Sequence, residues 1–218
     1  MQSLVCTAVR NVHNCFADFV AKNLTVDVAV PTLPGYTTLM SLFGWIVIHQ
    51  HIGDNFDWQL PWADYKAGFG SIDADFWLGL EKMHLLTSSR AYRLRVELQQ
   101  ETTGDWYSAE YWTFTIGDET NDGYRIDVDG YSGDANDGNR GCGWSGYVLS
   151  GMKFTTYDQD NDEKISGGNC AQSYGGGWWH NSCYCFCLTC DASYHEWYVF
   201  PDGNYHLVTS RMMIKPHD

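Results

Sequence analysis

Residues 154–183 carry the pattern that decides the fold: Phe154-Thr-Thr-Tyr-Asp158-Gln-Asp160-Asn-Asp162, then Cys170, then Gly175-Gly-Gly-Trp178-Trp179, then Cys183. Three carboxylates at alternate positions suit a hard cation such as Ca²⁺, which takes about six to eight oxygen ligands from carboxylates, backbone carbonyls and water. The two cysteines flank a segment rich in glycine and tryptophan and are placed to brace whatever the ion organises. The stretch predicts a calcium-stabilised recognition surface, not a catalytic centre.

The acidic run does not fit the commonest calcium loop. An EF-hand has Gly at its sixth position and Glu at its twelfth, and a helix on each side. Counted from Asp158, those positions hold Glu163 and Asn169, and neither flank resembles a helix. The remaining alternatives are a different calcium loop and a solvated acidic turn, because Asp and Asn are common in turns.

Composition and charge limit the function classes. The chain has 218 residues, of which 44% are hydrophobic and 10 are tryptophan, so it can bury a substantial core as one domain with subdomains. The formal net charge of −14 argues against binding to nucleic acid or anionic membranes, since both need clustered Lys and Arg. No apolar run reaches the roughly 18 residues of a spanning helix, and residues 1–30 lack the pattern of a signal peptide.

Cysteine usage favours an oxidising compartment. The sequence has 8 Cys, an even number, and many of them lie in glycine-rich stretches. Asn23-Leu-Thr25 is a glycosylation sequon in that setting. The cluster from Cys183 to Cys190 also suits zinc, but a second ligand pair is missing unless Cys142 or His195 provides it, so we prefer disulfides. We therefore expect a mature fragment of a secreted, extracellular protein.

Hydrophobic patterns predict an α+β domain. Apolar and β-branched runs at 44–49, 92–99, 107–116, 124–128 and 205–214 are typical of antiparallel strands, and 76–80 of a buried segment. Short helices are expected at 61–68 and 81–87, and one could begin within 15–30. Strands that follow one another with few helices form an α+β fold.

The order of motifs resembles the fibrinogen-like domain of fibrinogen chains, ficolins, tachylectins, angiopoietins and tenascins. The resemblance runs from about residue 14 to 216, and its motifs are Gly44-Trp45-x-Val47, Trp62-x-x-Tyr65-Lys66-x-Gly68-Phe69-Gly70, Phe76-Trp77-Leu78-Gly79, Gly130-Tyr131-Ser132-Gly133, Ser150-Gly-Met-Lys-Phe154, Gly168-Asn169-Cys170-Ala171-x-Ser173-Tyr174 and Met213-x-Lys215-Pro216. It implies a central twisted antiparallel sheet with short helices. It also implies subdomains at about 14–45, at 46–148 plus 205–216, and at 149–204, the last being loop-rich and calcium-binding.

The resemblance assigns roles within residues 158–195. It implies Ca²⁺ held by the side chains of Asp158 and Asp160 and by the backbone carbonyls of Asp162 and Lys164, with a carboxylate role for Asp162 left open. It implies a disulfide between Cys170 and Cys183 and, beside it, a pocket that seats an acetyl group in the sugar-binding members. The ligand-binding residues expected here are Tyr174, His180, Ser182, Cys183, Tyr184, Tyr194 and His195.

Two departures from the family pattern affect this expectation. Sugar-binding members have Asn before the second cysteine and His after it, whereas this chain has Ser182 and Tyr184, with Asn181 one place earlier. Cys15 has no cysteine near Tyr36 as its usual partner, so the connectivity of Cys6, Cys15, Cys142, Cys185, Cys187 and Cys190 stays open.

Other tempting residues have simpler explanations. His49 and His51 alternate on a strand and are expected to be exposed, although they could pair as metal ligands. The acidic run 127–134 could bind a second cation, but its Gly-Tyr-Ser-Gly core matches a structural turn of the family. No nucleophile elbow, zinc-protease helix or phosphate loop is present, so we do not expect an enzyme.

Three functions follow from the sequence. The first is a calcium-dependent lectin for N-acetyl or acidic glycans, whose weak single sites would need clustering in a homo-oligomer. The second is a protein-binding or assembly module that uses the same calcium-side face. The third is a structural domain linked to others by its extra cysteines. The lectin is the leading expectation.

Overall fold

A computed structural model describes residues 41–42, 44–53, 56–140, 147–165, 167–198, 200, 203 and 205–217. Its main element is a sheet of eight strands, with all pairs antiparallel. The strands are β1 (Ser41–Leu42), β2 (Trp45–His51), β3 (Phe69–Gly70), β4 (Phe76–Trp77), β5 (Tyr92–Gln100), β6 (Trp106–Ile116), β7 (Ile126–Gly133) and β10 (Leu207–Pro216). They follow the order β3-β4-β2-β10-β5-β6-β7, and β1 pairs with β2.

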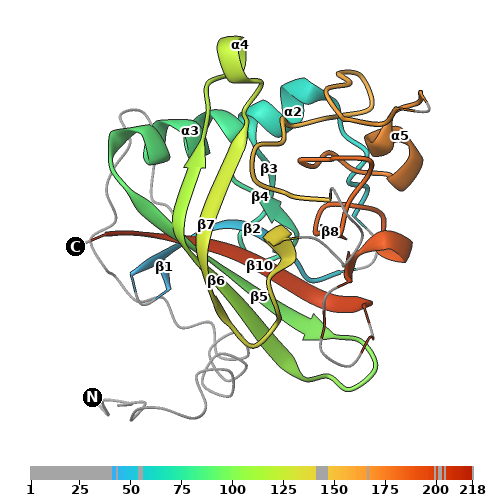
Figure 1. Ribbon diagram of the computed structural model, residues 1–218. Coiled ribbons are helices and arrows are strands. Elements are labelled where there is room, and N and C mark those ends of the chain that lie inside the picture. The colour runs from blue at the N-terminus through green and yellow to red at the C-terminus, as the bar shows by residue number, and fades with distance from the viewer. Residues whose placement is uncertain are drawn as a thin grey trace.

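The last strand in the sequence lies at the centre of this sheet. β10 pairs with β2 on one side and with β5 on the other, and Met212 lies opposite both His49 and Val96. The strand runs through the middle of Figure 1, with the loops of 147–206 gathered at one of its ends. β10 therefore joins the strands β3-β4-β2 on one side to β5-β6-β7 on the other.

Short helices complete the fold. They are α2 (Trp62–Ala67), α3 (Leu80–Ser89), α4 (Glu119–Asp122) and α5 (Cys170–Tyr174), with 3-10 turns η1 (Gly138–Arg140) and η2 (Ala192–Tyr194). Figure 1 shows α2 and α3 along the top of the sheet. The hydroxyl of Thr87 in α3 donates to the Met83 carbonyl and accepts from the Ile116 amide at the end of β6, which fixes helix to sheet.

A buried aromatic cluster joins the sheet to the loop region. Trp77 of β4 lies 5.8 Å, centroid to centroid, from Phe154 and 5.9 Å from Trp179. Tyr65 of α2 lies 5.1 Å from Phe154, and its hydroxyl accepts from the Gly177 amide at 3.0 Å. These rings are almost fully buried, and large aromatic side chains contribute the most apolar area to a core. The loops are thus packed onto the sheet and not appended to it.

The α+β fold is confirmed, and most predicted elements are present. The predicted helices at 61–68 and 81–87 correspond to α2 and α3, and all five predicted strands form. The possible helix in 15–30 and most of the subdomain at 14–45 lie outside the described residues. A second small sheet, β8 (Phe186–Cys187) with β9 (Glu196–Trp197), was not predicted.

Two predictions were wrong. The Gly-Tyr-Ser-Gly run at 130–133 is not a turn but the second half of β7, with Ser132 opposite Glu110. Gly130 lies in this strand at φ +74, where an added Cβ would come within 2.8 Å of the Trp112 side chain. His49 and His51 are not exposed but 0% and 2% accessible, because their rings point into the interior between β2 and the loop that follows β8.

Candidate functional site

The acidic loop at 158–164 is held by a backbone bridge beside it and by hydrogen bonds from two asparagine side chains. Thr155 and Trp178 form an isolated antiparallel bridge, with N–O distances of 2.9 and 3.1 Å. The Asn161 side-chain amide donates to the Phe154 carbonyl at 2.8 Å, and the Asn169 side-chain amide donates to the Thr156 carbonyl at 2.8 Å. The loop therefore wraps around two asparagine side chains without regular secondary structure.

Two aspartates of this loop, Asp158 and Asp162, make different contacts. Asp158 uses Oδ1 to accept from the Trp62 amide at 2.9 Å and from the Thr156 hydroxyl at 2.7 Å. Asp162 uses both oxygens, because Oδ1 accepts from the Lys164 amide at 2.9 Å and Oδ2 from the Cys170 amide at 2.7 Å. The Asp162 carboxylate therefore connects two parts of the loop through hydrogen bonds on both of its oxygens. These two bonds of Asp158 use only Oδ1, so Oδ2 remains for another contact.

The remaining oxygens suit a hard cation. Asp158 and Asp160 are exposed, and in the described part of the protein neither forms an ion pair with Lys or Arg. Within that same part, the carboxylate oxygens of all three aspartates do not gather within 4.8 Å of one another. The structure thus leaves Asp158 and Asp160 as exposed carboxylates and does not bring the three carboxylates of the loop together.

The acidic loop is joined at two points to the segment around residue 182. Cys170, whose amide donates to Asp162, forms a disulfide with Cys183. The Glu163 amide donates to the Asn181 carbonyl at 2.9 Å. The acidic loop is therefore linked, through one disulfide and one hydrogen bond, to the segment that contains Asn181 and Cys183.

Beside this disulfide, tyrosines form a continuous surface, which we call the tyrosine face: Tyr174, Tyr184, Tyr194, Tyr198 and Tyr205. Tyr174 meets Tyr184 at 4.9 Å and Tyr194 at 5.0 Å, both edge to face. Tyr184 lies 6.1 Å from Tyr198, which stacks on Tyr205 at 4.7 Å. Tyr194 and Tyr205 are 38% and 39% accessible, so the face is open to a partner.

A buried carboxylate lies beneath the tyrosine face. Glu196 is 5% accessible, and its Oε2 accepts from the Tyr184 hydroxyl at 3.0 Å. His206 Nδ1 lies 3.7 Å from its Oε1. Burial, and then the nearby Glu196 carboxylate, raise the pKa of Tyr184 and of Tyr198, so both phenols stay neutral. Aromatic faces next to a carboxylate attract cations.

A small apolar hollow lies next to this face. It is partly open to solvent, and its lining includes Leu149, Trp179, Cys183, Tyr184 and Phe186. The Ser182–Cys183 peptide bond at its edge is cis. Its aromatic and apolar walls suit an apolar group such as a methyl.

The structure brings together only some of the predicted ligand-binding residues. Tyr174, Tyr184 and Tyr194 lie side by side, and Ser182 and Cys183 lie at the edge of the hollow. The Ser182 carbonyl accepts from the Tyr147 hydroxyl at 2.6 Å.

His180 and His195 require a correction, because both side chains are buried and neither is exposed on the tyrosine face. His180 is 0% accessible, and its Nε2 lies 3.1 Å from the Gly176 carbonyl oxygen. His195 is 2% accessible, stacks on His51 at 3.8 Å, and has Nε2 at 2.7 Å from the Ser210 hydroxyl. Burial, and then the neighbouring histidines, lower the pKa of His195 well below its usual value. Both residues belong to the core that supports the face.

Sequence reasoning missed Glu196, Tyr198 and Tyr205. The available signal was the spacing of three tyrosines, Tyr194, Tyr198 and Tyr205, within a short segment that contains one glutamate. The burial of Glu196 cannot be recognised from sequence alone, because its hydrogen-bond partner Tyr184 precedes β8 and is not its neighbour in the sequence.

Disulfides, not zinc, occupy the cysteine cluster. Cys187 pairs with Cys190, Cys185 is also disulfide-bonded, and no described cysteine is free. The zinc alternative therefore does not apply to the oxidised protein. Cys6, Cys15, Cys142 and the sequon at Asn23 lie outside the described residues.

The second acidic run is part of the sheet. Asp127 accepts from the Ser150 hydroxyl at 2.6 Å, and Asp134 accepts from the Ser108 amide at 2.6 Å. These carboxylates fasten β7 to its neighbours. Separately, none of the helices in the described ranges has the length and apolar character needed to cross a membrane.

Comparison with known proteins gives a consistent result. The family profile of the C-terminal globular domain of the fibrinogen beta and gamma chains matches residues 37–217. Human angiopoietin-4 is 38% identical over 208 residues, which make up 89% of this chain and 39% of that protein. Mouse fibrinogen C domain-containing protein 1 is 36% identical over 186 residues, covering 79% of this chain and 38% of that protein. The chain thus spans about two fifths of the length of these relatives.

Solved structures agree with this result. The fibrinogen-like globe domain of human ANGPTL6 aligns with a TM-score of 0.69 and 31% identity over 80% of this chain and 78% of that one. Lamprey fibrin D-dimer, complexed with the peptide ligand Gly-His-Arg-Pro-amide, aligns with a TM-score of 0.69 and 30% identity over 80% and 62%.

Proposed function

The chain belongs to the family of the fibrinogen C-terminal globular domain, and on that basis we propose that it is a protein-binding module of an extracellular protein. The observation that carries this proposal is the tyrosine face, backed by buried Glu196 and linked through Cys183 to the acidic loop. Tyrosine is enriched where proteins bind one another, because its ring is large, rigid and amphipathic.

The chemistry of the face favours a basic peptide. Lamprey fibrin D-dimer, a structural relative, is complexed with Gly-His-Arg-Pro-amide, a peptide with an arginine and a free amino terminus. Neutral phenol rings attract such cations through their faces, with about 0.5–1 kcal/mol for each exposed contact. The formal net charge of −14 adds a general attraction.

In this proposal Ca²⁺ orders the face without touching the ligand. Asp158 and Asp160 would bind the ion through their carboxylates, and Asp162 and Lys164 through their backbone carbonyls. Both carboxylate oxygens of Asp162 already accept backbone N–H groups, which supports its role as a carbonyl ligand. An ion held there stabilises the loop, and the Cys170–Cys183 disulfide passes that order to the face.

Extracellular location is part of the same proposal. It is supported by the two disulfides, Cys170–Cys183 and Cys187–Cys190, and by the disulfide-bonded state of Cys185. Disulfides persist in oxidising compartments.

A lectin is the second candidate. The apolar hollow beside Cys183, with Trp179 and Tyr184 in its lining, has aromatic walls of the kind that receive the methyl of an N-acetyl group. Against it stand the changes at Ser182 and Tyr184, since Tyr184 uses its hydroxyl to bind Glu196 instead of facing a sugar.

Calorimetric titration with Gly-His-Arg-Pro-amide and with N-acetylglucosamine, in calcium and in EDTA, tests both candidates. We expect the peptide to bind in calcium and Glu196→Gln to weaken it several-fold, because the substitution removes the negative charge behind the tyrosine face while the amide oxygen can still accept from the Tyr184 hydroxyl. Asp129→Asn is the matched control, since it removes the same charge from an exposed position on β7. Binding of the sugar without the peptide would favour the lectin, and full peptide affinity in Glu196→Gln would overturn the role of the carboxylate.

A further inference from the structure

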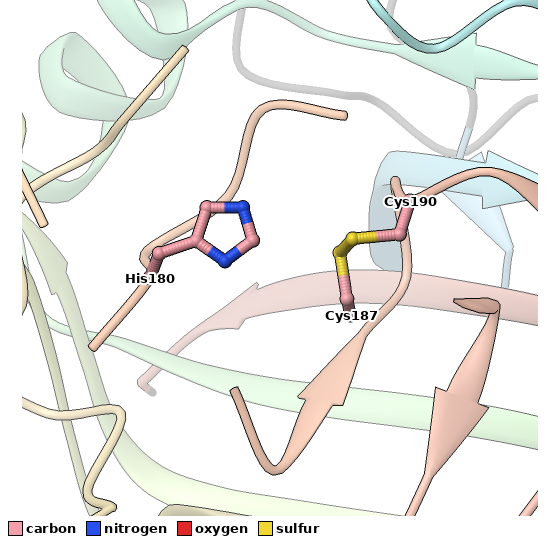
Figure 2. A group of neighbouring side chains, drawn as sticks. All are labelled: His180, Cys187 and Cys190. Carbon is pink, nitrogen blue, oxygen red and sulfur yellow. A yellow bond between two sulfur atoms is a disulfide. The ribbon is translucent and has the colours of Figure 1, made fainter. Parts of the chain in front are cut away.

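His180, Cys187 and Cys190 form a compact buried group behind the tyrosine face. Figure 2 shows the imidazole ring of His180 directed toward the Cys187–Cys190 disulfide. One ring nitrogen and the two sulfurs lie within 4.8 Å of one another, and all three residues are 0% accessible. Across the described ranges of the protein, this is the only group of His, Cys, Asp or Glu whose ligand atoms converge in this way.

The imidazole of His180 has unused bonding capacity. Its Nε2 lies 3.1 Å from the Gly176 carbonyl oxygen, whereas the buried Nδ1 has no hydrogen-bond partner. The Cys183 carbonyl is near enough to affect the pKa of His180 but does not meet hydrogen-bond geometry. A buried polar atom without a partner calls for an explanation.

The 187–190 turn is held by contacts that do not depend on its disulfide. The Leu188 carbonyl oxygen lies 3.1 Å from His49 Nε2 and 3.1 Å from His51 Nδ1, both on the central strand β2. The Thr189 hydroxyl donates to the Gly177 carbonyl. If the disulfide opened, these anchors would keep the two sulfurs facing His180.

We propose that reduction of the Cys187–Cys190 disulfide creates a Zn²⁺ site formed by Cys187, Cys190 and His180. A dithiol reductant would transfer two electrons and two protons, so that the S–S bond breaks, two thiols form and the dithiol closes to its own disulfide. Zn²⁺ then displaces both thiol protons and forms two Zn–S bonds and one Zn–N bond.

The donor set decides the metal. Two thiolates and one imidazole are soft ligands, which select Zn²⁺ over Ca²⁺ or Mg²⁺. Zn²⁺ is tetrahedral in such surroundings, so three protein ligands leave a fourth position for water or an incoming group. The Cys-x-x-Cys spacing matches the ligand pairs of zinc sites. The site binds metal only when reduced, and the oxidised protein is unable to form it.

Cobalt titration of the whole protein tests this proposal. The protein is reduced with dithiothreitol under anaerobic conditions, freed of reductant by gel filtration and titrated with Co²⁺, whose thiolate complexes absorb in the near ultraviolet. We expect a charge-transfer band at one equivalent in the reduced protein, its loss on adding Zn²⁺, and no band in the oxidised protein. No band in the reduced protein would overturn the proposal.

Differential alkylation locates the site without any mutation. The reduced protein is treated with iodoacetamide with and without Zn²⁺, and the modified cysteines are identified by peptide mass spectrometry. Because metal-bound thiolates are blocked, we expect Zn²⁺ to slow labelling of Cys187 and Cys190 by about tenfold or more and to leave Cys170 and Cys183 unchanged. Equal protection of all four cysteines, or protection of Cys170 and Cys183 alone, would refute the assignment.

Two variants complete the test. His180→Gln removes the imidazole ligand, and we expect Co²⁺ affinity to fall by roughly 100-fold. Loss of a residue that only hydrogen-bonds to a metal ligand lowers metal affinity by about 10- to 100-fold, and loss of a ligand itself should cost at least as much. The matched control is the double variant Cys170→Ser with Cys183→Ser, which removes the other disulfide and should keep the metal site. Unchanged affinity in His180→Gln, or lost binding in the control while its tryptophan fluorescence stays native-like, would show that the metal binds elsewhere.

Discussion

Replacing Asp162 by Asn separates two roles that the acidic loop combines. The carboxylate accepts backbone N–H groups from Lys164 at 2.9 Å and from Cys170 at 2.7 Å, one on each oxygen. An Asn side chain has one acceptor oxygen, so one of these N–H groups loses its partner and the other loses its charged acceptor. The backbone carbonyl, the group proposed to bind calcium, is unchanged.

The expected cost follows from these two bonds. Hydrogen bonds to charged groups contribute about 1.5–3 kcal/mol each; the Asn oxygen keeps one of the two bonds and Asp162 is half-buried, which places the loss near the lower end of the range for a single bond. We expect Asp162→Asn to lower the free energy of unfolding by about 2 kcal/mol without calcium. For a domain of this size that is a fall of roughly 4–8 °C in Tm.

Urea unfolding followed by tryptophan fluorescence, in EDTA and then in calcium, measures both roles. Asp158→Asn is the matched variant, because its amide oxygen can keep the bonds to Trp62 and Thr156 while the second carboxylate oxygen is lost. Calcium at about 100 times its Kd should stabilise the wild type by about 2.7 kcal/mol. We expect Asp162→Asn to keep this gain and Asp158→Asn to lose it. The reasoning is refuted if Asp162→Asn loses less than about 0.5 kcal/mol in EDTA, the usual range for a surface change.

Two further predictions concern the support behind the face. Gly176→Ala should destabilise the protein by roughly 3 kcal/mol in the same urea assay, because its Cβ would lie 1.7 Å from the Thr189 carbonyl oxygen and the backbone must move. Wild-type stability in this variant would contradict the close contact between residue 176 and the Thr189 carbonyl. Burial holds the pKa of His195 below its unfolded value of about 6.5. Below about pH 6.5 the unfolded state therefore binds more protons than the folded state, and the free energy of unfolding falls by about 1.4 kcal/mol per pH unit for each such proton. His195→Gln, which can still bond to Ser210, should make this pH dependence shallower; an unchanged slope would assign the effect to other groups.

Features set by local sequence could be predicted. The apolar run that forms β2 and the helix around Tyr65 follow from residues that are neighbours in the sequence. The Cys170–Cys183 disulfide follows from the motif that surrounds it, because the fibrinogen-like resemblance names that pair. In these cases the pattern and the structure are determined by the same short stretch.

Features set by distant partners could not be predicted. His49 and His51 alternate as exposed strand residues do, yet they are buried because the Leu188 carbonyl, 139 and 137 residues away, accepts from both. Glu196 resembles an ordinary surface glutamate until the β8–β9 hairpin brings Tyr184 to it. Sequence periodicity reports which side of an element is apolar, but not which loop arrives to cover its polar residues.

The shared acceptor at Leu188 also fixes where two protons reside. A carbonyl oxygen can only accept, so His49 must carry its hydrogen on Nε2 and His51 on Nδ1, which makes the two rings opposite tautomers only two residues apart. The ¹⁵N shifts of neutral imidazole distinguish these tautomers. If the 187–190 turn moves, both rings lose the partner that selects their tautomer and exchange between forms. Nitrogen spectra of these two histidines would therefore record the position of that turn from within the sheet.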